Sequence, residues 1–339
     1  MATEPIRDTL ILGGGPTGLF AAFYAGMRGL STTIVDSLEE LGGQLIALYP
    51  EKYIYDMPGF PRVLAKDLVA AMVEQALEFG PELVLGVKVV GLERRPDEVW
   101  QLIGDRDERL LGRTVVISAG AGGFTPRKLP LPEIERFEGA GIHYFVRDLE
   151  RFRNRRVLIV GGGDSALDWA LAIVPLARSV DLVHRRDQFR GHENTGKRVL
   201  ASEVRVHFFH EVAAVSGGEH VERVTLFHNK TQEQCELEVD DLVMCLGFKA
   251  DLGPIKQWGL EIVHGGIKVN SRMETNLPGV YAAGDVARFD GKLKLIANGV
   301  GEAAIAVNHA KTRLDPSART FPGHSSNLAA PPGEAGLAG

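Results

Sequence analysis

The stretch from residue 10 to residue 36, LILGGGPTGLFAAFYAGMRGLSTTIVD, constrains this chain most strongly. A short apolar run is followed by a glycine-rich turn, an alanine-rich segment with helical spacing, and a second β-branched run that ends at Asp36. This order predicts the strand, turn, helix and strand of a dinucleotide-binding unit.

Each glycine of the G-x-G-x-x-G pattern in this stretch has its own role. Gly13 makes the tight turn, Gly15 lets the backbone approach a pyrophosphate, and Gly18 lets helix and strand pack closely. The pyrophosphate would lie on amides at the helix N-terminus, where Thr17 adds a donor. Asp36 lies at the tip of the second strand, where its carboxylate can accept from both ribose hydroxyls. A tight turn in an ordinary α/β domain is the alternative interpretation.

The same design returns at residues 157–186, VLIVGGGDSALDWALAIVPLARSVDLVHRR, with the pattern G-x-G-x-x-A. The repeat predicts a second nucleotide site. A basic run replaces the acid at the end of its second strand, and guanidinium groups bind phosphate through two parallel hydrogen bonds. We therefore expect NADPH rather than NADH here, although a solvated basic turn is the alternative. The predicted contacts are Gly161, Gly163, Asp164, Ser165, His184, Arg185, Arg186 and Arg190.

Length and charge set outer limits on function. The 339 residues suffice for two domains, and the net charge of −6 argues against nucleic-acid binding. No apolar run approaches the length of a membrane span, and the first residues lack a basic and then apolar leader, so we expect a cytoplasmic protein. Cys235 and Cys245 form neither a C-x-x-C pair nor zinc ligands, and we expect both to be buried. No metal site is predicted.

The remaining pattern predicts an α/β fold with two Rossmann-like dinucleotide-binding domains, the second inserted into the first. A flexible crossover is expected at residues 118–123, and a second one follows residue 246. The predicted domains are 1–118 with 248–339, and 119–247. Helices are expected at 65–78 and 299–313, and strands at 83–93, 99–103, 109–118, 204–211, 221–228, 235–239, 241–246, 266–269 and 280–283.

Several residues each have a structural and a functional interpretation. A tyrosine in the aromatic loop at residues 49–60 either packs on the core or lies flat on a cofactor ring. Val89 is either a core residue or a backbone contact for an adenine. Asp285 is either a turn residue or an acceptor for the ribityl chain of a flavin, with the following helix aimed at the ring. His324, near the C-terminus, is by itself a solvated residue.

Six motifs together carry a family resemblance: GGGPTGLFAAFYAGMRG, GGQLIALYPEKYIYDMPG, GGGDSALDWA, HRRDQFR, METNLPGVYAAGD and LIANGVGEAAIAVNHAK. The chain resembles the thioredoxin-reductase-like ferredoxin–NADP reductases of bacteria from about residue 7 to residue 328. In the wider thioredoxin reductase family a C-x-x-C pair precedes the second nucleotide motif, and its positions here hold Phe145 and Asp148. The disulfide that relays electrons to thioredoxin is therefore absent.

The resemblance implies a thioredoxin-reductase-like fold with FAD in the first domain, NADPH in the second, and a homodimer. It places Tyr49 on one face of the isoalloxazine ring and His324 on the other. The flavin does the chemistry, so no catalytic side chain is named. The FAD contacts that the resemblance implies are Thr17, Asp36, Gln44, Tyr49, Val89, Phe124, Asp285 and Ser326.

The implied reaction is hydride transfer between NADPH and FAD, followed by single-electron transfer to ferredoxin or flavodoxin. One alternative is a flavin-dependent NADPH oxidase or a reductase that feeds another protein's disulfide. A different class of alternative is a redox-sensing flavoprotein that turns over slowly. Candidate basic contacts for an acidic electron carrier are Lys52, Arg62, Lys66, Arg127 and Lys128.

Overall fold

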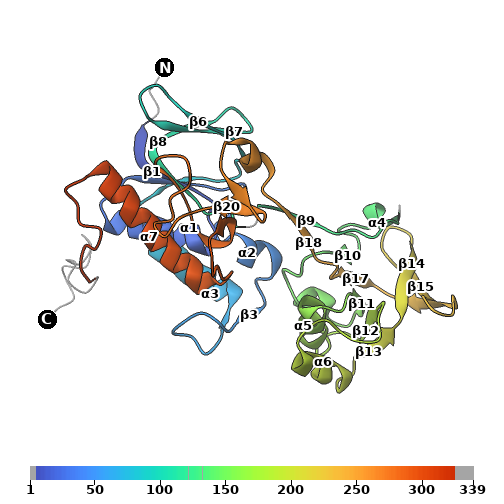
Figure 1. The fold of residues 1–339 in the computed structure, drawn as a ribbon. Coiled ribbons are helices and arrows are strands. Elements are labelled where there is room, and N and C mark those ends of the chain that lie inside the picture. Colours follow the sequence, from blue (N-terminus) through green and yellow to red (C-terminus); the bar gives the residue numbers. More distant parts are fainter. Residues whose placement is uncertain (1–4, 121, 132, 325–339) are drawn as a thin grey trace.

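The chain folds into two lobes joined by a narrow ribbon (Figure 1). The computed structural model describes residues 5–120, 122–131 and 133–324. Both ends of the chain build the first lobe, which is blue to cyan and orange to red in Figure 1, and the middle of the chain builds the second lobe, in green and yellow. The second lobe is therefore inserted into the first, as the repeated nucleotide motif predicts.

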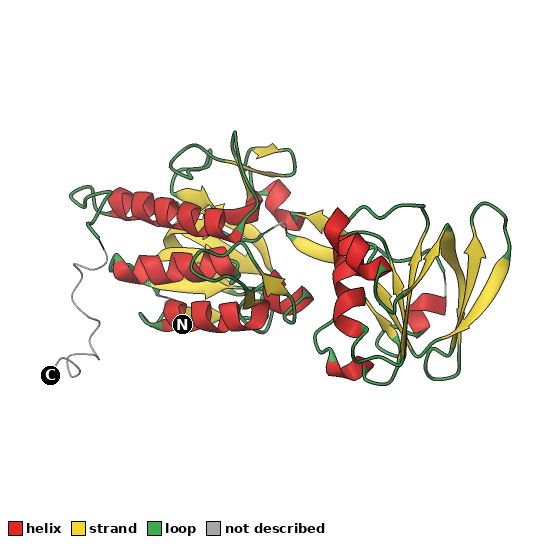
Figure 2. Ribbon diagram, turned by 90° about the horizontal axis from the view of Figure 1, so that it is seen from below, coloured by secondary structure: helices red, strands yellow, loops and turns green. Residues whose placement is uncertain are grey.

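A seven-stranded sheet forms the centre of the first lobe. The strands around β1 pair in parallel, and β6, β7 and β8 form an antiparallel meander. The helices α3, α1 and α7 lie side by side against the sheet (Figure 2). The order is β5 (Glu82–Val84), β2 (Thr32–Val35), β1 (Ile6–Leu12), β8 (Arg109–Ile117), β7 (Trp100–Gly104) and β6 (Val89–Arg94), and β21 (Val280–Ala282) also pairs with β8. The helices are α1 (Pro16–Met27), α3 (Ala65–Leu77) and α7 (Ile296–Leu314).

The prediction of one continuous strand at residues 83–93 is wrong, because the structure has two strands there. Gly86 has a φ of +69°, and its N–H donates to the carbonyl of Leu38 at 2.9 Å, so the chain turns there. One part, β5, extends the parallel side of the sheet, and the other part, β6, starts the meander. A positive φ at glycine is the local cause, and hydrophobic alternation alone does not reveal it.

The second lobe combines a parallel sheet of five strands with an antiparallel sheet of three. The strand expected at 204–211 breaks at Phe209, whose φ of +59° sends the chain into the second sheet. The parallel order is β10 (Ile142–His143), β17 (Asp241–Met244), β11 (Arg156–Val160), β12 (Ser179–His184) and β13 (Arg205–Phe208). The other sheet holds β14 (His210–Ser216), β15 (Arg223–His228) and β16 (Gln234–Glu238), and the helices are α4 (Glu133–Arg136), α5 (Asp164–Ile173) and α6 (Glu193–Leu200).

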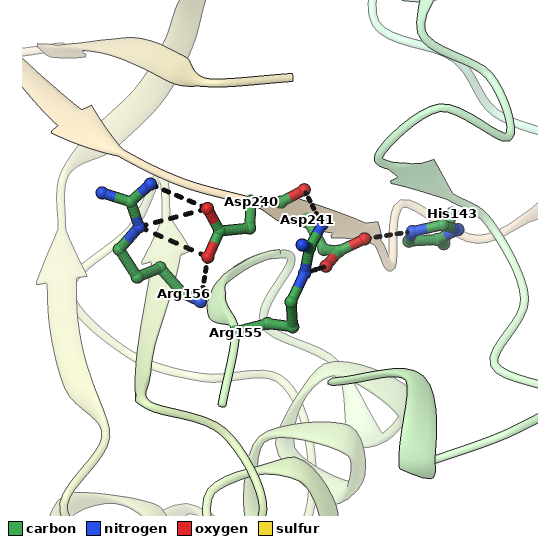
Figure 3. Close-up of polar contacts among 5 residues, drawn as sticks. All are labelled: His143, Arg155, Arg156, Asp240 and Asp241. Atoms are coloured by element: carbon green, nitrogen blue, oxygen red, sulfur yellow. Dashed lines mark hydrogen bonds and ion pairs between the residues drawn. The ribbon is translucent and has the colours of Figure 1, made fainter. Parts of the chain in front are cut away.

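A cluster of charged residues ties the beginnings of the strands in this parallel sheet (Figure 3). The Oδ1 atom of Asp241 lies 2.7 Å from Nε2 of His143, and Oδ2 accepts from Nε of Arg155 at 2.9 Å. Asp240 accepts from the backbone and the guanidinium of Arg156, and these hydrogen bonds lower the pKa of Asp240. Strands β11 and β17 start at this cluster and run toward the second glycine motif. The cluster therefore lies at the N-terminal ends of the strands, and the glycine motif lies at their C-terminal ends.

The two crossovers lead into a paired ribbon. Strand β9 (Gly123–Pro126) and strand β18 (Phe248–Asp251) pair antiparallel between the lobes, directly after the connections expected at residues 118–123 and after residue 246. The smaller elements are α2 (Gln44–Leu48), the hairpin of β3 (Tyr53–Ile54) and β4 (Val63–Leu64), a sheet of β19 (Ile262–Val263), β20 (Gly266–Lys268) and β22 (Ala287–Arg288), and the 3-10 turns η1 (Glu150–Phe152), η2 (Gly253–Gln257) and η3 (Gly284–Val286).

The two cysteines differ in their surroundings. Cys245 follows β17 and is partly buried, and burial raises the pKa of its thiol to about 12. Cys235 lies on β16 and is exposed, so the expectation that both are buried is wrong for Cys235. It lies on the strand at the edge of the small sheet, where one side of the strand has no neighbour in the described part of the chain. In the described ranges we find no helix with the length and apolar character that a membrane span needs.

Candidate functional site

The first glycine turn is closed by backbone contacts that only glycine permits. A Cβ atom on Gly13 would lie 2.5 Å from the carbonyl oxygen of Ser118, and one on Gly18 would lie 1.8 Å from the carbonyl oxygen of Gly13. Gly15 faces open space, because a Cβ there would meet nothing closer than 3.9 Å. Helix α1 begins directly after Gly15, so the amides of its first turn point into this space. The turn therefore fits a pyrophosphate.

Asp36 is buried at the end of β2 and is bonded to the same turn. Its Oδ2 atom accepts from the N–H of Gly14 at 2.5 Å, and Oδ1 accepts from the N–H of Leu38 at 2.8 Å. Burial raises the pKa of Asp36, although these amide bonds oppose the rise. Each carboxylate oxygen has a further lone pair, so Asp36 can shape the turn and still accept from a ribose hydroxyl.

Two of the residues predicted for FAD, Thr17 and Gln44, contact segments beside the first glycine turn. Thr17 lies against Gly284 and the α7 backbone, and Gln44 lies against Gly120. Burial raises the pKa of the Tyr49 phenol, and the charge of Asp285 raises it further. The aromatic ring, the acid and the open glycine turn together fit FAD.

Three further residues are predicted to contact FAD. Val89 is buried at the start of β6, two residues after Val87, whose N–H donates to the carbonyl of Asp36 at 3.0 Å. Phe124 belongs to the linker strand β9. Ser326 lies outside the described residues.

His324 lies far from this group in its own chain. Helices α1 and α7 run in the same direction, because Thr17 contacts α7 near its start and Arg28 donates to Asn308 at 2.8 Å near their ends. Arg28 also donates to the carbonyl of Arg319, so the C-terminal segment begins at the ends of the two helices that point away from the glycine turn. The exposed ring of His324 lies 5.5 Å from that of Phe321. The structure therefore does not bring His324 and Tyr49 together within one chain.

Sequence reasoning missed a buried acid in this region. The Oε2 atom of Glu302, on α7, accepts from the N–H of Gly284 at 2.8 Å, and its Oε1 atom contacts Nζ of Lys292. The signal in the sequence is one acidic residue in a helix of small residues, GVGEAAIAVNHAK. That pattern alone does not distinguish a buried acid from a solvated one.

The second glycine turn resembles the first in its packing. A Cβ atom on Gly161 would lie 2.6 Å from the carbonyl oxygen of Cys245. Gly163, at the start of α5, faces open space, since a Cβ there would meet no described atom within 4 Å outside its chain neighbours. The Oδ1 atom of Asp164 accepts from the N–H of His192 at 2.7 Å, which holds the following loop against the helix. Ser165 follows within the first turn of α5.

The basic run after β12 presents free guanidinium groups. Arg185, Arg186 and Arg190 are exposed, and none of them forms an ion pair within the described residues. His184 differs from them because it is buried beneath the turn, where its Nε2 atom lies 2.9 Å from the carbonyl oxygen of Gln188. Burial lowers the pKa of His184, and the neighbouring arginines lower it further. Unpaired arginines beside an open glycine turn fit NADPH.

Three of the candidate basic contacts for an electron carrier are already paired. Lys66 pairs with Glu51 at 2.9 Å, Lys128 with Glu138 at 2.7 Å, and Lys52 with Asp168 at 3.0 Å. The exposed Arg62 lies over the ring of Tyr53, with its Cζ atom 4.9 Å from the ring centroid. Arg127 is exposed in the linker.

An aromatic contact lies where the wider thioredoxin reductase family has its first redox cysteine. The ring of Phe145 stacks on that of Phe248, with centroids 5.3 Å apart and planes inclined by 12°. Phe248 belongs to β18 of the ribbon, so this contact packs the second lobe against the linker.

Comparisons with known proteins identify the family of this chain. A family model described as pyridine nucleotide-disulphide oxidoreductase matches residues 7–310. The chain is 52% identical over 322 residues to ferredoxin–NADP reductase 2 of Shouchella clausii, covering 95% of this chain and 97% of the relative. It is 49% identical over 324 residues to the ferredoxin–NADP reductase of Geobacillus thermodenitrificans, covering 95% and 97%.

Solved structures share the fold. Thioredoxin reductase of Lactococcus lactis, in its FR conformation, matches with a TM-score of 0.75 at 28% identity, covering 90% of this chain and 97% of that one. Thioredoxin reductase of T. acidophilum matches with a TM-score of 0.77 at 24% identity, covering 92% and 99%. The predicted fold of two dinucleotide-binding domains is thus confirmed. The chain belongs to the pyridine nucleotide-disulphide oxidoreductase family, among relatives that are named ferredoxin–NADP reductase.

Proposed function

We propose that this chain is an FAD-dependent ferredoxin–NADP reductase. The observation that carries the proposal is the pair of open glycine turns, the first followed by the buried Asp36 and the second by unpaired arginines. Relatives named ferredoxin–NADP reductase match 95% of the chain at about half identity, which supports the same activity here. We assign residues 1–118 and 248–339 to an FAD domain, and residues 119–247 to an NADPH domain.

The residues of the first lobe would bind and orient FAD. When bound, FAD accepts a hydride and gives up its electrons singly, which suits ferredoxin or flavodoxin as the acceptor. The amides of α1 would hold the pyrophosphate, and Asp36 would accept from the ribose. Tyr49 would cover one face of the flavin ring. The start of α7 would face the ring with the positive end of its dipole.

The second lobe would bind NADPH and select it over NADH. The start of α5 would hold the pyrophosphate, and Arg185, Arg186 and Arg190 would bind the 2′-phosphate. The buried and largely neutral His184 would support the turn from below rather than contact the phosphate.

The electron acceptor distinguishes the proposed function from its alternatives. Phe145 occupies the position of a redox cysteine, and its stacking on Phe248 supports a one-electron carrier over a disulfide substrate. Arg62 and Arg127 remain as the basic candidates for contact with an acidic carrier, since the three lysines have partners in the chain.

The proposal includes a homodimer and the cytoplasmic location expected from the sequence. A dimer gives His324 a way to cover a flavin, because the carbonyl of Arg319 is held by Arg28 at the far end of α1. Helix α1 has 12 residues and spans about 18 Å, so we assign the His324 that covers a flavin ring to a second copy of the chain. Truncation after Leu314 should then change the rate of flavin reduction or of ferredoxin reduction, and unchanged rates of both would contradict this role.

The test is anaerobic stopped-flow mixing of the yellow protein with NADPH and, separately, with NADH. We expect fast bleaching of the flavin band by NADPH, slow bleaching by NADH, and reoxidation on addition of ferredoxin. Bleaching without reoxidation by ferredoxin would instead favour an NADPH oxidase or a reductase for another protein's disulfide. Bleaching by NADPH slower than about 0.1 per second would favour a redox sensor, because enzymes commonly turn over faster than this.

A further inference from the structure

Lys292 and Glu302 form a buried ion pair beside the start of α7. The Nζ atom of Lys292 contacts Oε1 of Glu302, and the two side chains are only 5% and 6% exposed. Removing two opposite charges from water is costly unless further polar partners satisfy them. Nothing in the proposed electron transfer uses either residue, so the pair requires another explanation.

The second oxygen of Glu302 holds a backbone turn. Oε2 accepts from the N–H of Gly284 at 2.8 Å, in a buried hydrogen bond. Gly284 has a φ of +78°, and a Cβ there would lie 2.6 Å from Oγ1 of Thr17. Another residue at this position would meet both backbone strain and a clash. Glu302 therefore stabilises a turn that glycine alone makes without strain.

This turn carries Asp285, the next residue along the chain. Asp285 is the residue that we assign to the ribityl chain of the flavin, and Gly284 beside it lies against Thr17 in the first turn of α1. A displacement of the Gly284 amide would move Asp285 directly, because the two are joined by one peptide bond.

The positive charge of Lys292 allows Glu302 to accept this hydrogen bond as a buried carboxylate. Its Nζ atom compensates the charge of Glu302 and also lies 5.5 Å from the ring centroid of Phe289, in a cation–π arrangement. An ionised carboxylate accepts a stronger hydrogen bond than a neutral group does.

We propose that Glu302, with its charge compensated by Lys292, is a positioning residue that fixes the Gly284–Asp285 turn against the flavin. This inference depends on one part of the proposed function, namely that the first lobe binds FAD. It assigns to this pair a role in holding the flavin that is separate from electron transfer to a carrier.

The test compares two double variants of the holoprotein that differ only in the acceptor at position 302. Lys292→Met with Glu302→Gln removes both charges and keeps an oxygen for the Gly284 amide. Lys292→Met with Glu302→Met removes both charges and the acceptor. Replacing a buried ion pair with apolar side chains of similar volume is often neutral for stability, so both variants should fold.

The readouts are the FAD dissociation constant and the visible circular dichroism of the bound flavin. We expect the Met/Met variant to bind FAD about tenfold more weakly, because a buried amide that loses its hydrogen-bond partner costs free energy of this order. The circular dichroism spectrum of its bound flavin should also differ from that of the wild type. The Met/Gln variant should stay close to the wild type. Equal behaviour of the two variants, whether both normal or both impaired, would overturn the proposal. Glu261→Ala, which breaks the exposed pair with Lys268, is the matched control and should change neither readout.

A measurement on the wild type covers the case in which the variants fail to fold. Because Glu302 bonds the Gly284 amide without any ligand, a peptide that covers this turn should stay protected from hydrogen exchange after FAD is stripped. Fast exchange there in the apoprotein would overturn the proposal. None of these readouts uses NADPH or ferredoxin, so failure to reduce ferredoxin leaves them valid, whereas a wild type that takes up no FAD would refute the proposed function itself.

Discussion

The Nζ atom of Lys52 lies 3.0 Å from Oδ2 of Asp168 and thereby joins the two lobes. Lys52 follows α2 in the first lobe, and Asp168 lies on α5, the helix that starts at the second glycine turn. The Nζ atom also lies 5.3 Å from the ring centroid of Trp169. Tyr49 packs against the hydrophobic clusters of both lobes. The contact therefore bridges the two lobes, and we expect it to help hold their relative orientation.

Lys52→Met should loosen this orientation with little loss of stability. The pair is partly exposed, with side chains 20% and 45% accessible, and an ion pair of this kind contributes about 1 kcal/mol, so the unfolding midpoint should change little. We expect faster proteolysis at the ribbon of β9 and β18, and a changed rate of flavin reduction by NADPH. Lys268→Met, which removes an exposed ion pair within the first lobe, should do neither. If ribbon cleavage and reduction rate both match the wild type, this contact does not govern the orientation.

Arg185→Ala should weaken NADPH binding selectively. Losing a hydrogen bond to a charged group costs about 1.5 to 3 kcal/mol, so we expect the dissociation constant of NADPH to rise at least about tenfold while that of NADH stays the same. NADP⁺ and NAD⁺ differ by the same 2′-phosphate and do not reduce the flavin, so titration of the oxidised protein with each of them should show the same selective loss. Arg223→Ala removes an exposed arginine from β15 in the same lobe and controls for net charge. An equal loss for both nucleotides would argue against 2′-phosphate recognition.

Asn229→Ala should reduce the same preference indirectly. The Nδ2 atom of Asn229 donates to the carbonyl of Arg185 at 2.8 Å and to Oε1 of Glu211 at 3.1 Å. Its removal frees the backbone that carries the arginine, so we expect a loss of NADPH preference of about threefold to tenfold, smaller than for Arg185→Ala. Thr231→Ala, in the same turn, is the control. A preference equal to that of the wild type would show that Asn229 does not position Arg185.

Alkaline pH should destabilise the protein through Tyr281. This side chain is 1% exposed, and burial raises its pKa from 10.0 to about 12. Because the folded state holds the proton more tightly than the unfolded state, the stabilisation is complete below pH 10 and is lost as the pH rises toward 12. Two pKa units correspond to about 2.7 kcal/mol at most.

Urea unfolding of the wild type and of Tyr281→Phe at pH 8, 10 and 11.5 checks this expectation. The phenylalanine variant should lose less stability over the range. Their difference isolates Tyr281, because Cys245, whose pKa is also raised by burial, titrates in both proteins. Parallel pH dependence in the two proteins would contradict the assignment.

The sequence alone determined both nucleotide turns, the acid after the first and the arginines after the second. These features were predictable because each is set within about thirty residues, by backbone conformations that glycine permits and by side chains at a strand end. The strand breaks at Gly86 and Phe209 were not predictable from the sequence, because a single residue with a left-handed backbone leaves the hydrophobic alternation around it unchanged. The exposure of Cys235 likewise depends on its place at the edge of a sheet.

Only the tertiary structure decided the contacts between distant segments. Glu302 meets Gly284 because α7 packs beside the turn, and Lys52 meets Asp168 because the segment after α2 lies beside α5 of the other lobe. The separation of His324 from Tyr49 depends on the course of α7 past α1. Local patterns show which residues can carry charge or bend the chain. Which charges are buried, paired or left free is set by packing between elements that are far apart in the chain.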